Sequence, residues 1–285
     1  MPRAISQLKR HGRRSAKAWF VAIALAATGA GNKAEATDLS SLYTSDAIVT
    51  GTGEENRELG FRECLSEVLV KVSGDFKIAD SAALAALQRN AAPYVASFTY
   101  RDRLEGVPIH DEQGTHDRPH DLTCRFDPAI IDPLLAKLDR KPWLSPRPVI
   151  AVLLAVHDQR RRFVLARDGS ESPYMVQSLE AATVPLALTA RLPDVATLTA
   201  GGLDFEHLPQ LKPAELGSLA TQIDAEIPLA GTLVWSDAAR GWIADWRLIE
   251  NGSEHHWQIR GVSFDDAFRN AMRGAARILS GNGAP

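Results

Sequence analysis

The pattern of apolar and polar residues predicts a first half that mixes helices and strands. Apolar residues recur at helical spacing through residues 55–75, and Ser73-Gly74 then supplies a helix stop. Strands are expected where side chains alternate at 41–51, 94–104 and 120–126, and further helices at 80–95 and 127–138. The order β-α-α-β-β-α favours helices over one face of a small, mostly antiparallel sheet.

The second half begins with a different pattern. Residues 149–156 are a continuous apolar run of strand length, which is typical of a strand covered on both faces. Asn251-Gly252 marks a tight turn between two strands within 241–261. Further strands are expected at 184–190 and 227–235, and helices at 173–182, 212–223 and 263–280, the last with Ser263 as its cap.

These elements predict a mixed α/β (α+β) protein of two small sheet-and-helix domains, with helices packed mainly on one face of each sheet. Residues 139–148 contain three prolines and interrupt the pattern, so they are expected to form a stiff linker. The two domains would then comprise residues 37–138 and 149–285.

Residues 1–36 have the composition of a secretory signal peptide. A basic start precedes an apolar run at 18–30, and Ala34 and Ala36 occupy the positions that a signal peptidase reads. The run is about 13 residues long, whereas a membrane-spanning helix needs about 20. We therefore expect cleavage after Ala36, export by the general secretion route, a periplasmic location and no transmembrane segment in the mature chain.

Removing the signal makes the chain strongly acidic. The full sequence has 32 basic and 35 acidic residues. Residues 1–36 contain seven of the basic residues and one of the acidic residues. The mature chain keeps 25 basic and 34 acidic residues, a net charge of −9. Because like charges lower encounter rates, nucleic acid and anionic lipid are disfavoured as partners.

The chain has two cysteines, Cys64 and Cys124. In an oxidising compartment such an isolated pair most simply forms a disulfide. The bridge would stabilise the fold by roughly 4 kcal/mol in the chain-entropy model. Cys64 lies on the apolar stripe of its helix, and Cys124 shares strand parity with apolar neighbours, so both should point inward. A single catalytic thiol is the alternative.

Candidate metal ligands gather in the stretch "HDEQGTHDRPHDLTC", residues 110–124. Imidazoles and carboxylates of this kind can bind zinc. Gly114 and Pro119 argue against a helix that would align them, so we interpret the stretch as a solvated hairpin. The alternative is a metal-dependent hydrolase, with this loop folded into a cleft beside other acids or His157. Its candidate ligands would be His110, His116, His120 and Asp117.

A second candidate site uses aromatic residues. Tryptophans occur at alternating positions in the C-terminal strands, where they could stack on sugar rings of a glycan. Large aromatics in such strands more often form the core under a terminal helix. The residues concerned are Trp235, Trp242, Trp246 and Trp257.

Several segments resemble the DUF2066 family, secreted proteobacterial proteins of unknown function. They are "LYTSDAIV", "FRECLSEVLVKVSGD", "PYVASFTYRDR", "LAGTLVWSD", "GWIADWRLIENG" and "HHWQIRGVS". The resemblance implies an envelope location and a two-part architecture, and it supplies no activity or catalytic residues.

The sequence contains no reaction motif that would identify an enzyme. It lacks a Gly-x-Ser-x-Gly elbow, a Gly-rich phosphate loop, His-Glu-x-x-His and Cys-x-x-Cys. We therefore assign no catalytic residue and no cofactor. The sequence favours a non-enzymatic binding or accessory protein for a cell-envelope protein or glycan, which should show an exposed apolar groove or patch.

Native mass spectrometry of the untagged protein, purified from the periplasm, tests these expectations together. We expect a mass that begins at Thr37 and is two hydrogens lighter than the reduced chain. A stoichiometric zinc, lost when His116 and His120 are changed to alanine, would contradict the hairpin interpretation.

Overall fold

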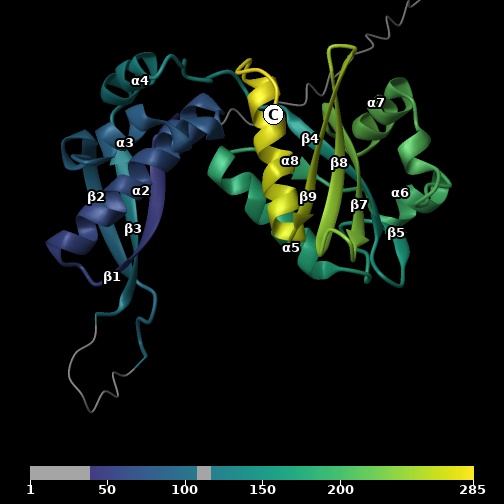
Figure 1. Ribbon diagram of the computed structural model, residues 1–285, viewed down its shortest axis with the longest axis horizontal. Helices are drawn as coiled ribbons and strands as arrows, with labels where there is room; N and C mark the ends of the chain where they lie inside the picture. The colour runs from purple at the N-terminus through teal and green to yellow at the C-terminus, as the bar shows by residue number, and fades with distance from the viewer. Residues whose placement is uncertain (1–38, 108–116) are drawn as a thin grey trace, which may run out of the picture. The chain divides into compact units, whose positions relative to one another are not determined.

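The computed structural model describes residues 39–107 and 117–285 (Figure 1), and these belong to one compact unit, Glu35–Pro285. The predicted mixed α/β (α+β) class is confirmed, because the chain forms two sheets accompanied by helices. The proposed cleavage after Ala36 and the residues His110 and His116 lie outside the described residues. In the described ranges, no helix combines the length and apolar composition needed to cross a membrane.

The N-terminal sheet is antiparallel and has the order β1-β3-β2. Its strands are β1 (Thr44–Thr50), β2 (Val95–Asp102) and β3 (Pro119–Phe126), preceded by the short α1 (Leu39–Leu42). The helix α2 (Glu54–Ser73) covers one face and ends at Gly74, whose φ of 74° is the left-handed conformation of a typical helix stop. The predicted apolar stripe of α2 is buried, as are its partners on β3.

The predicted helix at 80–95 is interrupted. Residues Phe76–Asp80 form a 3-10 helix, and α3 (Ala82–Gln88) begins only after Ser81, whose side chain accepts a hydrogen bond from the Leu84 N–H. The helix at 127–138 is confirmed as α4 (Pro128–Lys137), with Asp127 as its cap. The predicted start of the helix at 80–95 is therefore right, but its end is wrong, because α3 stops at Gln88 and Ala92–Tyr94 form a separate 3-10 helix.

The cysteines meet as predicted. Cys64 on α2 and Cys124 on β3 lie as a disulfide pair with Cα atoms 6.3 Å apart, and neither side chain is exposed. This distance is within the normal range for a bridge. The pair fastens α2 to the central strand of the N-terminal sheet.

The second sheet has the order β5-β4-β7-β8-β9, and β6 also pairs with β4. β4 (Val149–His157) runs parallel to β7 (Ile227–Ser236) and to β6 (Thr189–Arg191), and antiparallel to β5 (Arg162–Val164). The strands β8 (Gly241–Glu250) and β9 (Ser253–Val262) continue as an antiparallel meander. Asn251 and Gly252 both have positive φ at the turn, which confirms the predicted hairpin.

Helices cover both faces of this sheet, so the expectation that they pack mainly on one face is wrong for the second sheet. On one face, α5 (Pro173–Thr183) and α8 (Phe264–Leu279) bury a core with β4, β7 and β8, and α8 lies along β8 and β9 (Figure 1). On the other face, α6 (Val195–Ala200) and α7 (Pro213–Gln222) pack through Leu198 and Leu216. The continuous apolar run of β4 follows from this double coverage.

The expected strand at 184–190 is wrong for its first half. Val184–Leu186 form a 3-10 helix with Pro185 in the first turn, and Ala187 has a φ of 48°. Only Thr189–Arg191 join the sheet. The proline has no N–H to donate to a strand ladder, and a left-handed residue interrupts an extended chain.

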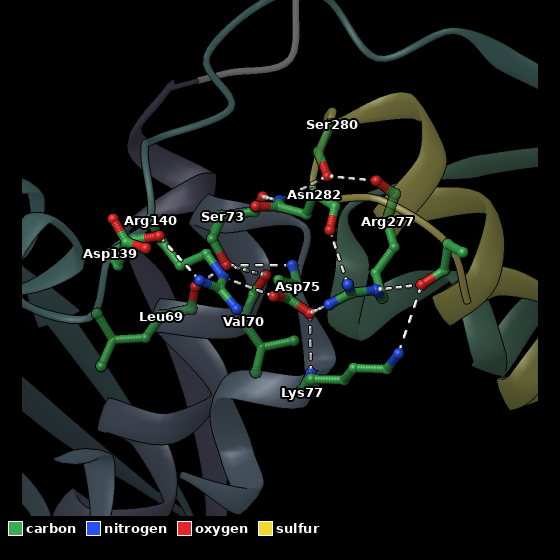
Figure 2. Close-up of polar contacts among 11 residues, drawn as sticks. Leu69, Val70, Ser73, Asp75, Lys77, Asp139, Arg140, Arg277, Ser280 and Asn282 are labelled. Carbon is green, nitrogen blue, oxygen red and sulfur yellow. Dashed lines mark hydrogen bonds and ion pairs between the residues drawn. The ribbon is translucent and has the colours of Figure 1, made fainter.

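A buried ion cluster joins the exit of α2 to the end of α8. The Asp75 side chain is fully buried, and Figure 2 shows Arg140 and Arg277 approaching it from opposite sides. Arg140 donates over 2.6 Å, Arg277 donates from Nη1, and the Lys77 N–H donates over 3.0 Å. Burial alone would raise the pKa of Asp75, but these hydrogen bonds outweigh it and lower the pKa below its ordinary value.

Changing Asp75 to asparagine should lower the free energy of unfolding by about 3–5 kcal/mol near pH 7, because two arginines lose their buried counter-charge. The pKa is lower in the folded state, so the charged carboxylate stabilises the fold above the unfolded pKa of about 4 and this contribution is lost at more acidic pH. Denaturant unfolding across pH 3–8 measures the effect.

The matched control is Asp224→Asn, which alters an ion pair with Arg191 in which the aspartate side chain is 75% exposed. An exposed pair contributes about 0–1 kcal/mol, so this variant should unfold almost like the wild type. Equal losses in the two variants would contradict the role given to Asp75.

Candidate functional site: a groove between β5 and α6

The residues predicted as metal ligands do not come together in the described part of the chain. His120 is half-buried on β3, and its Nδ1 lies 2.7 Å from the Arg118 carbonyl oxygen. Asp117 is exposed, and the remaining two candidates, His110 and His116, lie outside the described residues. Within residues 39–107 and 117–285, no three histidine, cysteine, aspartate or glutamate side chains form a group able to hold a metal ion.

The tryptophans of the meander pack as core residues. Trp242 and Trp246 are buried under α8, and the ring of Trp257 lies so close to Gly274 that a Cβ there would sit 2.7 Å from it. Trp235 meets Trp242 edge-on, with an interplanar angle of 83°. These four rings therefore offer no exposed coplanar pair for a sugar.

Glu67, a half-buried residue of α2, has a raised pKa. Burial is the main cause that raises its pKa from 4.5 to about 7, the negative charge of Glu63 adds to it, and Lys71 opposes it. Groups with shifted pKa often act in catalysis when they face a cleft. Glu67 does not line the hollow between β5 and α6 or either of two other hollows of the C-terminal half, and burial on α2 is the main cause of its shift.

A hollow lined by both apolar and polar side chains opens between β5 and α6, which lie side by side in Figure 1. Its volume is about 420 Å³, within the range typical of ligand-binding clefts. We call this hollow the β5–α6 groove. Its apolar lining comes from the strand, the helix and the loop after it, namely Phe163, Val164, Ala166, Val195, Leu198, Leu203 and Phe205.

Local sequence explains how this lining is held. Asp194 caps α6 by accepting the Thr197 N–H, and its carboxylate also pairs with Arg167 at 2.7 Å. These contacts hold the pKa of Asp194 well below its ordinary value. After α6, Gly202 takes a φ of 60°, which returns the chain towards the sheet. The helix and its following loop are thereby fixed as one wall of the groove.

Phe205 is the aromatic part of that wall. Its ring lies 5.6 Å from the His157 ring, and the Arg162 guanidinium carbon lies 5.3 Å from the ring centroid. Arg162 also pairs with Glu206 at 2.6 Å. The arginine and the histidine hold the phenylalanine in place, and Val195 beside it remains 46% exposed.

The strand β5 contributes unpaired backbone groups at this position. The Leu165 N–H donates to the Leu154 carbonyl, and the Asp158 N–H donates to the Arg161 carbonyl. Because hydrogen-bonded residues alternate in an antiparallel pair, the backbone groups of Arg162 and Val164 point away from β4. No described residue pairs with β5 on that side.

A larger hollow of about 520 Å³ lies on the other side of α6, but its two arginines are already paired. Arg191 donates to the carbonyls of Ile223 and Asp224, and Arg167 binds Asp194. A ligand there would have to displace these internal contacts. The β5–α6 groove presents apolar surface and free backbone groups, so it is the better candidate.

The comparisons with known proteins concern the N-terminal half. A family model described as a domain of unknown function (DUF8605) matches residues 36–144. The resemblance to DUF2066 was therefore wrong, since DUF8605 is a different family. The segments that suggested it are short amphipathic helices and strands, which unrelated folds also need. No curated protein matches the chain. The β5–α6 groove lies beyond the matched residues.

Sequence reasoning missed the groove because its elements are short. β5 has three residues and α6 has six, too few for either periodicity to be visible. Two local signals were present: Asp194 preceding "VATLTA" is a capping residue, and Gly201-Gly202 marks a helix end. They identify a helix, but only the tertiary fold places it beside β5.

Replacing Glu67 with glutamine should stabilise the protein at alkaline pH. A carboxyl whose pKa is raised by folding contributes full stability below its unfolded pKa, near 4.5, and loses it as the pH rises through about 7. The glutamine cannot ionise, so at pH 8 its free energy of unfolding should exceed that of the wild type by roughly 1 kcal/mol, allowing for partial exposure.

Urea unfolding at pH 4, 6 and 8 measures this difference. Glu58→Gln is the control, because Glu58 is an exposed residue of the same helix with a long 3.8 Å contact to Arg62. A wild-type free energy of unfolding that stays constant between pH 4.5 and 7 would contradict the raised pKa of Glu67.

Proposed function

We propose that this protein is a non-enzymatic accessory protein of the cell envelope that binds an extended segment of a partner protein in the β5–α6 groove. The observation that carries the proposal is a hollow with an apolar wall, bordered by a strand whose outer backbone groups have no partner among the described residues. Strand addition is a general mode of peptide recognition, in which main-chain hydrogen bonds give affinity and side-chain pockets give specificity.

The groove defines the chemistry of the bound segment. Extended peptides present alternate side chains to the same side, so apolar residues two apart would contact the wall formed by Leu198, Leu203 and Phe205. The intervening side chains would lie near the charged rim, where Arg162, Glu171 and Asp204 occur. A segment that alternates apolar and polar residues fits this arrangement, whereas a polyanion has no concentrated positive charge to meet.

The envelope location rests on the first 36 residues and on the cysteines. A basic start, a short apolar run and small residues near Ala36 favour export. The Cys64–Cys124 pair lies at disulfide distance, and such pairs persist in oxidising compartments. We therefore expect the partner segment to be exposed in the periplasm.

Blocking the groove with a charged side chain tests the proposal. Val195→Arg adds bulk and charge at an exposed position of the wall, whereas Val184→Arg makes the same change at a valine that is 69% exposed and does not line the groove. Peptides selected from a phage-displayed random library against the mature protein serve as ligands. Val195→Arg should raise their dissociation constant at least about tenfold, and Val184→Arg should leave it unchanged.

Amide hydrogen exchange on the complex provides the second measurement. Peptide addition along β5 should slow exchange of the Val164 amide, which faces away from β4 in the free protein. Selected peptides that bind equally to both arginine variants, or that leave this amide unprotected, would exclude the groove as their site.

A further inference from the structure

The strand β2 forms one edge of the N-terminal sheet. We propose that β2 pairs with β2 of a second copy of this chain, in antiparallel orientation, so that two three-stranded sheets join into one. This inference concerns a surface separate from the β5–α6 groove, and it does not depend on the function proposed there.

The hydrogen-bond register shows which backbone groups are available. β2 and β3 pair with Phe98 opposite Cys124 and Tyr100 opposite Leu122, and the Arg103 N–H donates to the Pro119 carbonyl. Hydrogen-bonded positions alternate along an antiparallel pair, so Phe98 and Tyr100 direct their N–H and C=O groups away from β3. No described residue donates to or accepts from these four groups.

The opposite edge of the same sheet, on β1, is partly covered by α2. On β1, the same alternation directs the carbonyls of Thr44 and Thr50 outward. The Lys71 ammonium donates to the Thr44 oxygen over 2.7 Å, and the Asn56 amide donates to the Thr50 oxygen. Two outward carbonyls of β1 thus have side-chain partners from α2, whereas no described side chain bonds to the outward groups of Phe98 and Tyr100. Natural proteins usually blunt exposed edges, so an open one indicates a partner strand.

A two-fold axis beside Thr99 makes β2 complementary to itself. Each Phe98 then lies opposite Tyr100 of the second copy, which forms four backbone hydrogen bonds and two aromatic pairs. On the other face of the sheet, Thr99 lies opposite its own copy and Arg101 lies opposite Ser97. No like charges face each other in this register. A closed two-fold contact of this kind makes a dimer and leaves no strand free to extend it.

Aromatic side chains beside the β2 edge support a second copy of this chain as the partner. Phe98 is 41% exposed although its ring contacts Phe61 at 5.2 Å and Tyr100 at 5.7 Å. The Arg57 guanidinium carbon lies 5.6 Å from the Phe98 centroid. The Tyr100 hydroxyl is buried without a hydrogen-bond partner. A second copy would bring its own Phe98 and Tyr100 to these rings and cover the apolar surface.

Sedimentation of the mature protein between about 1 and 100 µM tests the pairing. We expect a dimer for the wild type. Thr99→Glu places a carboxylate opposite its own copy and should raise the dimer dissociation constant at least about tenfold. Ser97→Glu places the same carboxylate opposite Arg101 and should keep or tighten the dimer. Both positions are exposed, so the change of charge does not disturb the core.

Proline substitutions test whether the dimer forms through the β2 edge or the β1 edge. Tyr100→Pro removes one outward N–H from β2 and should yield monomers, whereas Ile48→Pro removes an outward N–H from β1 and should leave the dimer intact. Circular dichroism checks that each variant is folded. If a proline variant does not fold, the comparison of Thr99→Glu with Ser97→Glu carries the test. A wild type that remains monomeric at 100 µM, or equal dissociation constants for Thr99→Glu and Ser97→Glu, would overturn the proposal.

Discussion

The packing of distant segments depends most on the ion cluster in which the buried Asp75 carboxylate binds two arginines. The carboxylate lies at the exit of α2, and it accepts hydrogen bonds from Arg140 after α4 and from Arg277 near the end of α8. Asp75 and Arg277 are 202 residues apart in sequence. A buried charge of this kind is tolerated only when it is fully paired, so the three segments must be in place together. Asn282 adds a hydrogen bond to the Ser73 carbonyl beside it.

Both proposed interaction surfaces depend on strand edges rather than on reactive side chains. At β5 and at β2, backbone groups face away from the sheet and apolar side chains lie next to them. Backbone donors and acceptors are present at every residue, so such a site leaves no motif of its own. A chain without a catalytic motif can therefore still bind another chain through its strand edges, as we propose for β5 and β2.

The elements predicted with most success were those with long regular patterns. The helix α2, the doubly buried strand β4 and the Asn251-Gly252 hairpin agree with the sequence, because each pattern covers several turns or alternations. The short elements were predicted poorly. Pro185 and Ala187 ended the expected strand at 184–190, and neither β5 nor α6 was anticipated. The candidate groove lies in this unpredicted region, since its walls are built from the shortest segments of the chain.

By itself, the sequence determined the mixed α/β class, the inward direction of Cys64 and Cys124, and the packing role of the tryptophans. These follow from periodicity and side-chain size, which act locally along the chain. The tertiary structure alone decided which backbone groups at strand edges find a partner, because that partner can be distant in sequence, as Lys71 is for the Thr44 carbonyl on β1. It also decided that Asp75 meets two arginines and that α6 lies beside β5. Such contacts depend on how the elements pack, and no spacing along the chain encodes them.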